Sequence, residues 1–465
     1  MTKNETIDKI VKYNKLYSSY YTNYPPVGEW TEDFIKTTTY ENILMETFSM
    51  SRDKKNISLY LHFPYCHSQC YFCHCHTIIS KDHSKYHSFL QTLESELKVF
   101  KQLLDKEVLN VNIVDIHLGG GSPSEMNEEE FTYMKKMIST IVDFNNINEF
   151  SVEIDLRFCS EEKINFFAKS GITRISFGVQ DFNDDVQHAI NRIQPFSLFS
   201  EMVPKVRDKF RGVNFDLIYG MPYQTIESFQ ETINNVIKLS PDRIALYRYN
   251  HKPSLHKHQK AIESNRLPSE TDYIKINYHA IEKLLENGYM RVGIDHFAKE
   301  SDNLGVASIN KDLVRNFMGY TAGEYGYTVG FGPSAMSDLY GYYLQNIYDM
   351  NNYKEKINDD QIPLFRGYKL SQDDIIRREV IYQVMNNFQV DFTSLSTKYE
   401  IDFFEYFHEE QKQLEELKQD GLLTLDTKIL DITDIGKHCL RNIAIVFDKI
   451  YSETKQYKYS KDFVS

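Results

Sequence analysis

The chain has 465 residues and a formal net charge of −13 at neutral pH. This length predicts one large domain with a smaller one appended and enough residues for a sizeable core. The acidic balance argues against a general binder of nucleic acid or of membrane surfaces. No apolar run approaches a membrane span. Nothing near Met1 resembles a signal peptide, so we expect a cytoplasmic protein.

Strand-forming runs alternate with amphipathic helical stretches through residues 57–362. The predicted strands cover residues 57–63, 113–118, 150–154, 174–179, 213–218 and 243–247. The predicted helices cover residues 86–104, 128–142, 224–238 and 271–286. This alternation indicates a parallel sheet built from βα units, either a barrel or an open sheet. Such folds carry their sites at the carboxyl ends of the strands. We expect residues 1–56 to form an N-terminal extension that precedes this region.

Four cysteines follow the first predicted strand: Cys66, Cys70, Cys73 and Cys75. The C-x3-C-x2-C spacing of the first three lets their thiolates wrap one iron–sulfur cubane and leave its fourth iron open. Zinc, the alternative, normally takes two separated cysteine pairs, and Cys159 and Cys439 are isolated. Cysteine is otherwise too scarce for a disulfide framework. Cys75 is either a strained fourth ligand or a buried thiol beside the cluster.

Polar or glycine residues end the next predicted strands. The run Gly119-Gly120-Gly121-Ser122-Pro123 lets the backbone approach a ligand closely, although such runs also form ordinary turns. Glu153 ends the third strand, where a carboxylate among apolar residues needs a partner unless it faces solvent. Gln180 closes the fourth strand and Asp216 lies in the fifth. We expect these groups to converge on one site.

A cationic segment follows the sixth predicted strand. Residues 243–262 contain no Asp or Glu, and their basic residues are Arg243, Arg248, His251, Lys252, His256, Lys257, His258 and Lys260. In so acidic a chain this segment is a candidate cradle for an anionic substrate, with Arg248 and Lys252 as its candidate ligands. A solvated basic loop is the alternative. His296, next to Asp295, could relay protons, bind the substrate or be purely structural.

The pattern changes in residues 363–465. Helices are predicted over residues 372–385 and 404–420, followed by a hairpin over 422–432 and another helix to about residue 451. This order is typical of a winged-helix module. The stretch 404–420 is rich in Glu and would repel phosphate, so we expect a lid or packing domain rather than a DNA-binding one.

The cysteine spacing, with Phe72 as the aromatic before Cys73, resembles the hallmark of the radical S-adenosylmethionine (radical SAM) superfamily. The resemblance implies a [4Fe-4S] cluster whose open iron is chelated by S-adenosylmethionine (SAM), and a 5′-deoxyadenosyl radical that abstracts hydrogen. It also implies a partial (β/α)6 TIM-like barrel, here with a mostly helical, winged-helix-like C-terminal domain.

Residues 60–75, 178–183, 216–222, 293–298 and 315–321 resemble the oxygen-independent coproporphyrinogen III oxidase family, in family order and over nearly the whole chain. The resemblance implies oxidative decarboxylation of two propionates of coproporphyrinogen III, an anionic tetrapyrrole, to give protoporphyrinogen IX. It further implies an unidentified electron donor and acceptor. We expect no nucleic-acid partner, because of the acidic charge, and a monomer.

The family's functional positions transfer to this chain residue by residue. Cys66, Cys70 and Cys73 would ligate the cluster. The positions implied to bind SAM are Tyr60, Phe72, Gly120, Gly121, Ser122, Glu153, Gln180, Arg192 and Asp216. The family is also described with a second SAM molecule beside the first. For the substrate, Arg248, Lys252 and His296 are the candidates.

The chain departs from the family pattern at several positions. Tyr20 stands where the family has an arginine, Leu156 where it has a proline, and Asn250 where it has an alanine. None of these is a cluster ligand, so the changes bear on substrate identity more than on reaction class. Two alternatives stay open: a methyl-transferring haem ring-opening radical enzyme and a non-enzymatic haem chaperone. Cys75 and the complete C-terminal module argue against the chaperone.

Overall fold

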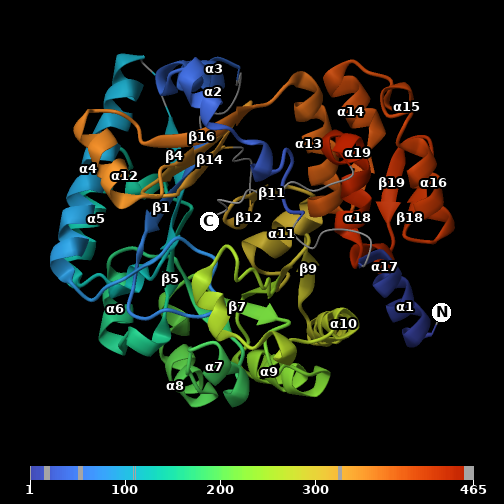
Figure 1. The fold of residues 1–465 in the computed structure, drawn as a ribbon, viewed down its shortest axis with the longest axis horizontal. Coiled ribbons are helices and arrows are strands. Elements are labelled where there is room, and N and C mark those ends of the chain that lie inside the picture. The colour runs from blue at the N-terminus through green and yellow to red at the C-terminus, as the bar shows by residue number, and fades with distance from the viewer. Residues whose placement is uncertain are drawn as a thin grey trace.

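The computed structural model describes residues 2–14, 21–50, 56–107, 109, 111–322 and 327–454. Six parallel strands, each neighbouring the next, form its curved centre (Figure 1). These strands are β1 (Asn56–Phe63), β4 (Asn112–Gly120), β5 (Glu149–Ile154), β6 (Arg174–Gln180), β7 (Gly212–Tyr219) and β8 (Arg243–Arg248). All six predicted strands are confirmed, each within two residues of its predicted ends. The interior of β1 is largely buried, as expected for a strand covered on both faces.

Further strands extend the sheet on both sides to twelve strands. Beyond β1 lie β13 (Tyr327–Phe331), β14 (Met336–Leu339), β15 (Tyr342–Asn346) and β16 (Leu364–Lys369), and beyond β8 lie β10 (His296–Ala298) and β9 (Met290–Val292). Only β13 among these pairs parallel, with β1. None of these additional strands was predicted from the sequence. The expected boundary at residue 363 falls just before β16, which still belongs to the large sheet.

Helices cover the outer side of the parallel strands (Figure 1). They are α4 (His83–Lys106), α5 (Glu128–Ile138), α6 (Glu161–Lys169), α7 (Asp184–Ala189), α8 (Phe196–Val206), α9 (Ile226–Leu239) and α10 (Glu270–Glu286). The predicted helices correspond to α4, α5, α9 and α10, although α5 ends four residues early. In α9 a capping box between Thr225 and Ser228 starts the helix, and Phe229, Ile233 and Val236 point into the core.

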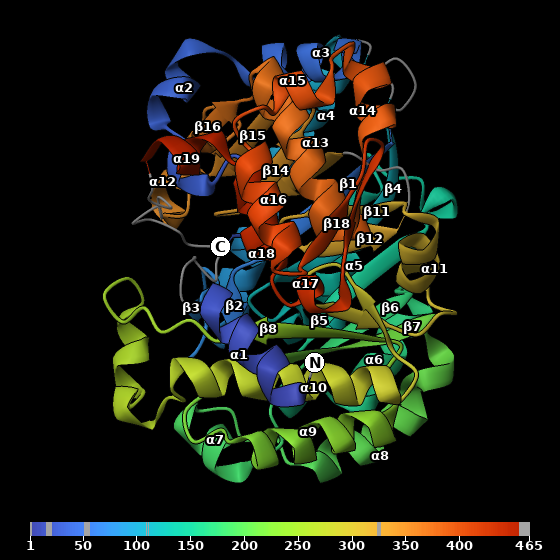
Figure 2. The ribbon, with the colours of Figure 1, turned by 90° about the vertical axis from the view of Figure 1, so that its right-hand side faces the viewer.

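The N-terminal extension divides between two parts of the molecule. Helix α1 (Lys3–Asn14) lies beside α10 and the C-terminal helices (Figure 2), and its Ile7, Ile10 and Tyr13 join the buried core of the C-terminal module. Helices α2 (Glu32–Thr37) and α3 (Tyr40–Met50) instead pack near the β16 edge of the sheet. Tyr20, the departure from the family pattern, lies outside the described residues.

The C-terminal module has a winged-helix-like order. It contains α13 (Gln372–Asn387), β17 (Gln389–Asp391), α14 (Phe392–Tyr399), α15 (Phe403–Tyr406), α16 (Gln411–Gln419), β18 (Leu423–Leu425), β19 (Ile429–Ile432), α17 (Asp434–Lys437), α18 (Leu440–Ala444) and α19 (Lys449–Thr454). Strands β17, β19 and β18 form a small antiparallel sheet. The predicted first helix and the hairpin are confirmed, whereas the single helix over residues 404–420 is wrong. The chain turns between α15 and α16, where the side chain of Glu410 is buried and accepts from Arg377 Nη1 at 2.8 Å. The last predicted helix is likewise broken into α17, α18 and α19.

The chain between β10 and β16 adds further elements beside the parallel strands. It includes α11 (Asn303–Asn310), the antiparallel pair β11 (Leu313–Asn316) and β12 (Gly319–Ala322), and α12 (Met350–Asn358). Tyr320 on β12 donates a hydrogen bond to the Met385 carbonyl of α13 at 3.3 Å, which ties this region to the C-terminal module. None of the helices in the described ranges combines the length and apolar character that a membrane crossing needs.

Candidate active site

The cysteine loop leaves the carboxyl end of β1 and returns through a short parallel pair. Strands β2 (Tyr65–Cys66) and β3 (Ile78–Ile79) bring the two ends of the loop together. Cys66, Cys70 and Cys73 line one cavity of about 140 Å³, which we call the cluster cavity. Among the described residues, no group of His, Cys, Asp or Glu converges as the ligands of one metal ion would. A cubane differs from a single ion because each of its irons takes a separate cysteine.

Two arginines surround the sulfur of Cys70. Arg157 Nη2 and Arg192 Nη1 lie 3.4 and 3.5 Å from Cys70 Sγ. Both guanidinium groups also bind Asp155, at 2.6 and 3.1 Å. Burial would raise the pKa of Asp155, but the two arginines outweigh it and hold that pKa low, so the carboxylate stays charged. The sulfur of Cys70 thus faces two positively charged groups.

Arg192 therefore lies at the predicted site but has several protein partners. Besides Cys70 and Asp155, its Nη2 donates to the Gly178 carbonyl at 2.8 Å. From the sequence, Arg192 was expected to bind SAM, and Arg157 and Asp155 had no predicted role. Their place two residues apart, directly after the end of β5, was the available signal.

The glycine run closes the other side of the cluster cavity. Gly121 N–H donates to the Phe63 carbonyl at 2.7 Å, and Ser122 N–H donates to the Tyr65 carbonyl at 2.8 Å. A Cβ atom on Gly121 would lie 2.5 Å from the Tyr65 carbonyl oxygen. Gly120 has a φ of +101°, which a residue with a Cβ rarely adopts. Only glycines allow the backbone to pass this close to the cysteine loop.

Three polar side chains from β5, β6 and β7 line the same cavity: Glu153, Gln180 and Asp216. His117 Nε2 lies 3.1 Å from Glu153 Oε1 and donates to it, a partner that the sequence analysis missed. Burial and the neighbouring Glu153 raise the pKa of Asp216. Gln180 has a left-handed φ of 62°, and its buried Oε1 has no hydrogen-bond partner within the described residues. An unpaired buried acceptor at this place is what a ligand donor would satisfy.

Tyr60 lies deeper in the barrel than the cluster cavity. Its hydroxyl is 2.9 Å from His62 Nδ1, and His62 Nε2 is 2.9 Å from the His76 carbonyl. Because a carbonyl only accepts, Nε2 carries the proton and Tyr60 donates to Nδ1. Burial lowers the pKa of His62 to about 4, which agrees with a neutral ring. Tyr60 is thereby oriented, with its ring stacked on His117 at 6.0 Å between centroids.

A larger cavity of about 450 Å³, the central cavity, fills the barrel interior. This volume lies within the ~300–1,000 Å³ range of small-molecule sites. Its wall shares five residues with the cluster cavity: Cys75, Gly120, Glu153, Gln180 and Asp216. Cys75 thus faces the cavities. Tyr60 and His296 also line the central cavity.

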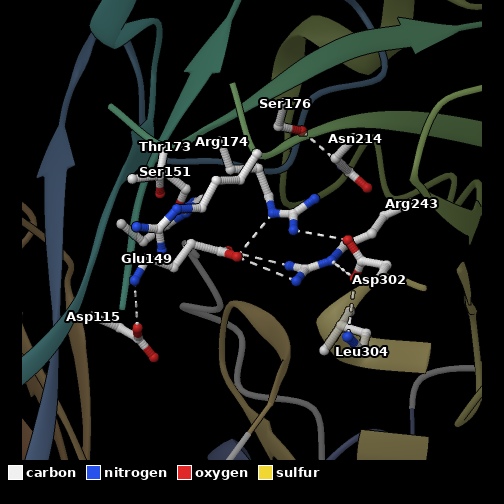
Figure 3. Close-up of polar contacts among 12 residues, drawn as sticks. Asp115, Glu149, Ser151, Thr173, Arg174, Ser176, Asn214, Arg243, Asp302 and Leu304 are labelled. Carbon is white, nitrogen blue, oxygen red and sulfur yellow. Dashed lines mark hydrogen bonds and ion pairs between the residues drawn. The ribbon is translucent and has the colours of Figure 1, made fainter. Parts of the chain in front are cut away.

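An ion network lines the end of the central cavity where the strands begin (Figure 3). Arg174 at the start of β6 binds Glu149 and Asp302, at 2.8 Å each. Arg243 at the start of β8 binds Glu149 at 3.1 Å and Asp302 at 2.5 Å. Burial alone would raise the pKa of Glu149, but Arg243 and Arg174 lower it to about 2. The two arginines are neutralised by the two carboxylates, so they add little net charge to the cavity.

His296 is held by a charged partner behind it. Its Nδ1 lies 2.8 Å from Asp295 Oδ1, which is 3.5 Å from Arg315 Nη1. Burial opposes ionisation of Asp295, but Arg315 and His296 outweigh it and keep its pKa far below the usual value. Because Asp295 only accepts, Nδ1 of His296 carries a proton, and Nε2 lies on the side of Gly319 and the cavity.

The other two substrate candidates lie elsewhere. Side chains alternate along β8, so Arg243 and Tyr247 face the central cavity while Leu246 and Arg248 face a separate cavity of about 50 Å³ against α10 and α18. Arg248 there binds Glu270 at 2.9 Å. Lys252 is absent from the lining of the central cavity and donates its backbone N–H to Gln259 at 2.6 Å. The structure does not bring Arg248 and Lys252 together with His296.

Phe72 lines the cluster cavity from the cysteine loop and packs against a small apolar cluster that includes Ile190, Tyr249 and Ile262. The residues present fit a [4Fe-4S] cluster and SAM. Three cysteines line one cavity, and the glycine backbone leaves room beside them. The buried Gln180 Oε1 has no hydrogen-bond partner among the described residues, so it can accept from a ligand.

Comparison with known proteins agrees with this geometry. Residues 60–236 match the profile of the Radical SAM superfamily, and residues 370–437 match that of the HemN C-terminal domain. The chain is 36% identical over 451 residues to the oxygen-independent coproporphyrinogen III oxidase of Helicobacter pylori, covering 96% of this chain and 97% of the relative. Its identity to the oxygen-independent coproporphyrinogen III oxidase of Escherichia coli K12 is 35% over 441 residues, covering 94% of each.

The fold gives the same answer. The solved structure of coproporphyrinogen III oxidase from Escherichia coli, described as a radical SAM enzyme, matches with a TM-score of 0.86 and 34% identity, over 93% of this chain and 97% of that one. The predicted radical SAM barrel with a helical C-terminal region is confirmed. The cofactors of this class are a [4Fe-4S] cluster and SAM. The chain therefore belongs to the oxygen-independent coproporphyrinogen III oxidase family of radical SAM enzymes.

Proposed function

We propose that this chain converts coproporphyrinogen III to protoporphyrinogen IX by oxidative decarboxylation of two propionate side chains. The observation that carries the proposal is the wall shared by the cluster cavity and the central cavity. When bound, the reduced cluster and SAM supply a radical that removes one hydrogen atom from a propionate. Each propionate then loses CO2 and one electron, which an external acceptor takes up, and becomes a vinyl group. Family membership and the relatives' names support this substrate.

The chain's own residues would bind and orient. We assign the cluster to Cys66, Cys70 and Cys73. We assign SAM to the glycine run and the polar side chains of β5, β6 and β7 described above, with Gln180 Oε1 as an acceptor for a SAM donor. A second SAM molecule stays a prediction. The paired arginines would hold the Cys70 sulfur in place by hydrogen bonds, and the barrel wall would separate the reacting atoms from bulk water.

His296 is our proposed anchor for a carboxylate of the substrate. It faces the central cavity, and Asp295 fixes its protonated Nδ1, so Nε2 is directed to the cavity side. The substrate role of Arg248 and Lys252 stays a prediction, which their positions do not support. We also propose a monomer in the cytoplasm, where a reducing environment keeps the six cysteines free, as they are here.

The test is an anaerobic reaction of the reconstituted, reduced protein with SAM and coproporphyrinogen III, followed by mass spectrometry. Loss of two CO2 per substrate, with 5′-deoxyadenosine formed in step, is the expected result. A methylated or ring-opened tetrapyrrole would instead identify a haem ring-opening enzyme. Stoichiometric haem binding without turnover would identify a haem chaperone.

A further inference from the structure

The basic segment of residues 251–262 lies directly against the cysteine loop, on the outside of the barrel. His258 Nε2 donates to the Cys73 carbonyl at 2.7 Å, since a carbonyl can only accept. Gln259 Nε2 donates to the Phe72 carbonyl at 3.2 Å. Figure 2 shows this yellow-green segment between β8 and α10 at the edge of the molecule, on the side of β2 and β3. A surface segment is therefore bonded to the backbone of a proposed cluster ligand.

The segment is also held rigidly to that loop. Tyr249, two residues before the segment, and Ile262, at its end, are each 3% exposed and belong to an apolar cluster that Phe72 packs against. His74 Nε2 donates to the Asn250 carbonyl at 2.7 Å, because a carbonyl oxygen can only accept. A molecule bound to the outside of the segment would thus sit at a fixed distance from the cluster.

The outer face of the segment carries unpaired positive charge. Lys257 and Lys260 lie on the short 3₁₀ helix Lys257–Ala261, and both are exposed. In the part of the chain that the structure describes, neither forms an ion pair with a carboxylate. Glu263 is the nearest acidic residue along the chain, and it pairs with Arg266 instead, with 3.6 Å between Glu263 Oε2 and Arg266 Nε. The segment contains no Asp or Glu, in a chain whose net charge is −13.

We propose that this basic segment is the docking surface for an acidic one-electron carrier protein that reduces the cluster. The inference rests on the proposed function, because that reaction needs a reduced cluster. The carrier gives up one electron and the cluster gains it, with no bond made or broken. Positive charge here would steer an acidic partner to this surface beside Cys73, in a chain whose net charge is negative. The His258–Cys73 hydrogen bond gives a short bonded path from that surface to the cluster.

The experiment uses the cluster-loaded full chain under anaerobic conditions and a reduced flavodoxin as the acidic probe. The double variant Lys257→Glu, Lys260→Glu reverses the charge of the surface. Its matched control, Lys238→Glu with Lys412→Glu, changes the net charge equally at exposed sites on α9 and α16. Cluster reduction is followed by its absorbance and by electron paramagnetic resonance, and flavodoxin binding is measured separately as a function of salt.

We expect the docking variant to be reduced by flavodoxin about tenfold more slowly than the control at low salt, with the difference vanishing at high salt. Reduction by methyl viologen radical, a small cation that the introduced carboxylates do not repel, should be no slower in the docking variant than in the control. Equal flavodoxin rates and affinities in the docking and control variants would overturn the proposal. Slowing with both reductants would also overturn it, because it would indicate a damaged cluster loop. Cluster reduction is read without product, so failure of the proposed decarboxylation would be seen separately.

Discussion

At the scale of single residues, neighbouring cysteines of the loop occupy different positions relative to the two cavities. Cys66, Cys70 and Cys73 line the cluster cavity, whereas Cys75 lies on the wall shared with the central cavity. Cys70 also contacts the arginine pair, Arg157 and Arg192, which no composition or spacing rule would have revealed. Its members come from the end of β5 and the turn after α7 and meet only in the fold.

The roles of Cys73 and Cys75 can be separated. We expect Cys73→Ser to lose the cluster after reconstitution, because a three-cysteine cubane cannot spare a ligand. Cys75→Ser should keep the iron–sulfur absorbance and the full iron content, with any loss confined to turnover. Iron analysis and absorbance spectra give the answer, and Cys159→Ser, at a buried isolated thiol, serves as the control. A Cys75→Ser protein without a cluster would make Cys75 a ligand.

Gly121 should be needed for SAM binding more than for stability. In Gly121→Ala the new Cβ would meet the Tyr65 carbonyl at 2.5 Å, so the backbone beside the cluster cavity must move. We expect the apparent SAM dissociation constant to rise ~10-fold or more, or about 1.4 kcal/mol. Gly288→Ala is the control, because that site is open but has a φ of +82°. It should cost roughly 1 kcal/mol of stability and leave SAM affinity unchanged. Similar SAM affinities in the two variants would refute this role of Gly121.

At the scale of secondary-structure elements, the ion network of Figure 3 joins the starts of β5, β6 and β8 to the start of α11. Asp302 caps α11 by accepting from Leu304 N–H at 2.9 Å while it binds both arginines. The residue pattern within a single strand could not predict this ion network, because the four charged residues lie up to 153 positions apart in the sequence.

The network makes a pH-dependent contribution to stability. Because the pKa of Glu149 is about 2 in the folded chain and near 4.5 when unpaired, its charge stabilises the fold above about pH 5. This contribution, about 3 kcal/mol, is lost as the pH falls through ~2. Glu149→Gln should therefore be less stable than the parent at pH 7, and the difference should shrink toward pH 2. Urea unfolding of both apoproteins at several pH values measures it. Asp33→Asn, at an exposed ion pair, is the control, and a gap that does not change with pH would contradict the assignment.

The sequence predicted elements well where their pattern is regular and long. The barrel strands are runs of apolar residues bounded by helices, so all six were found. Strands such as β14 and β10 have only four and three residues, and their pairing depends on partners far along the chain. Arg248 shows a second limit. Composition placed it in a basic segment, but the alternation along β8 turns it away from Arg243 and Tyr247, and only the sheet defines which face is inside.

At the scale of the whole molecule, the order of the chain differs from the order in space. The N-terminal α1 completes the core of the C-terminal module, and β13, from beyond residue 326, pairs in parallel with β1 beside the cysteine loop. Neither association has a local signal. The convergence of the strand-end motifs, by contrast, was predictable. A parallel βα architecture brings the carboxyl ends of consecutive strands to one side of the sheet. The result is a cofactor site and a substrate-sized cavity that share one wall.

The most direct test of the central claim is to follow one hydrogen atom across that shared wall. Coproporphyrinogen III deuterated at the propionate β-carbons would be turned over anaerobically, and the 5′-deoxyadenosine would be analysed by mass spectrometry. The account predicts deuterium in the deoxyadenosine, one molecule formed for each CO2 released. Release of CO2 with unlabelled deoxyadenosine, or labelled substrate recovered intact while deoxyadenosine accumulates, would contradict it.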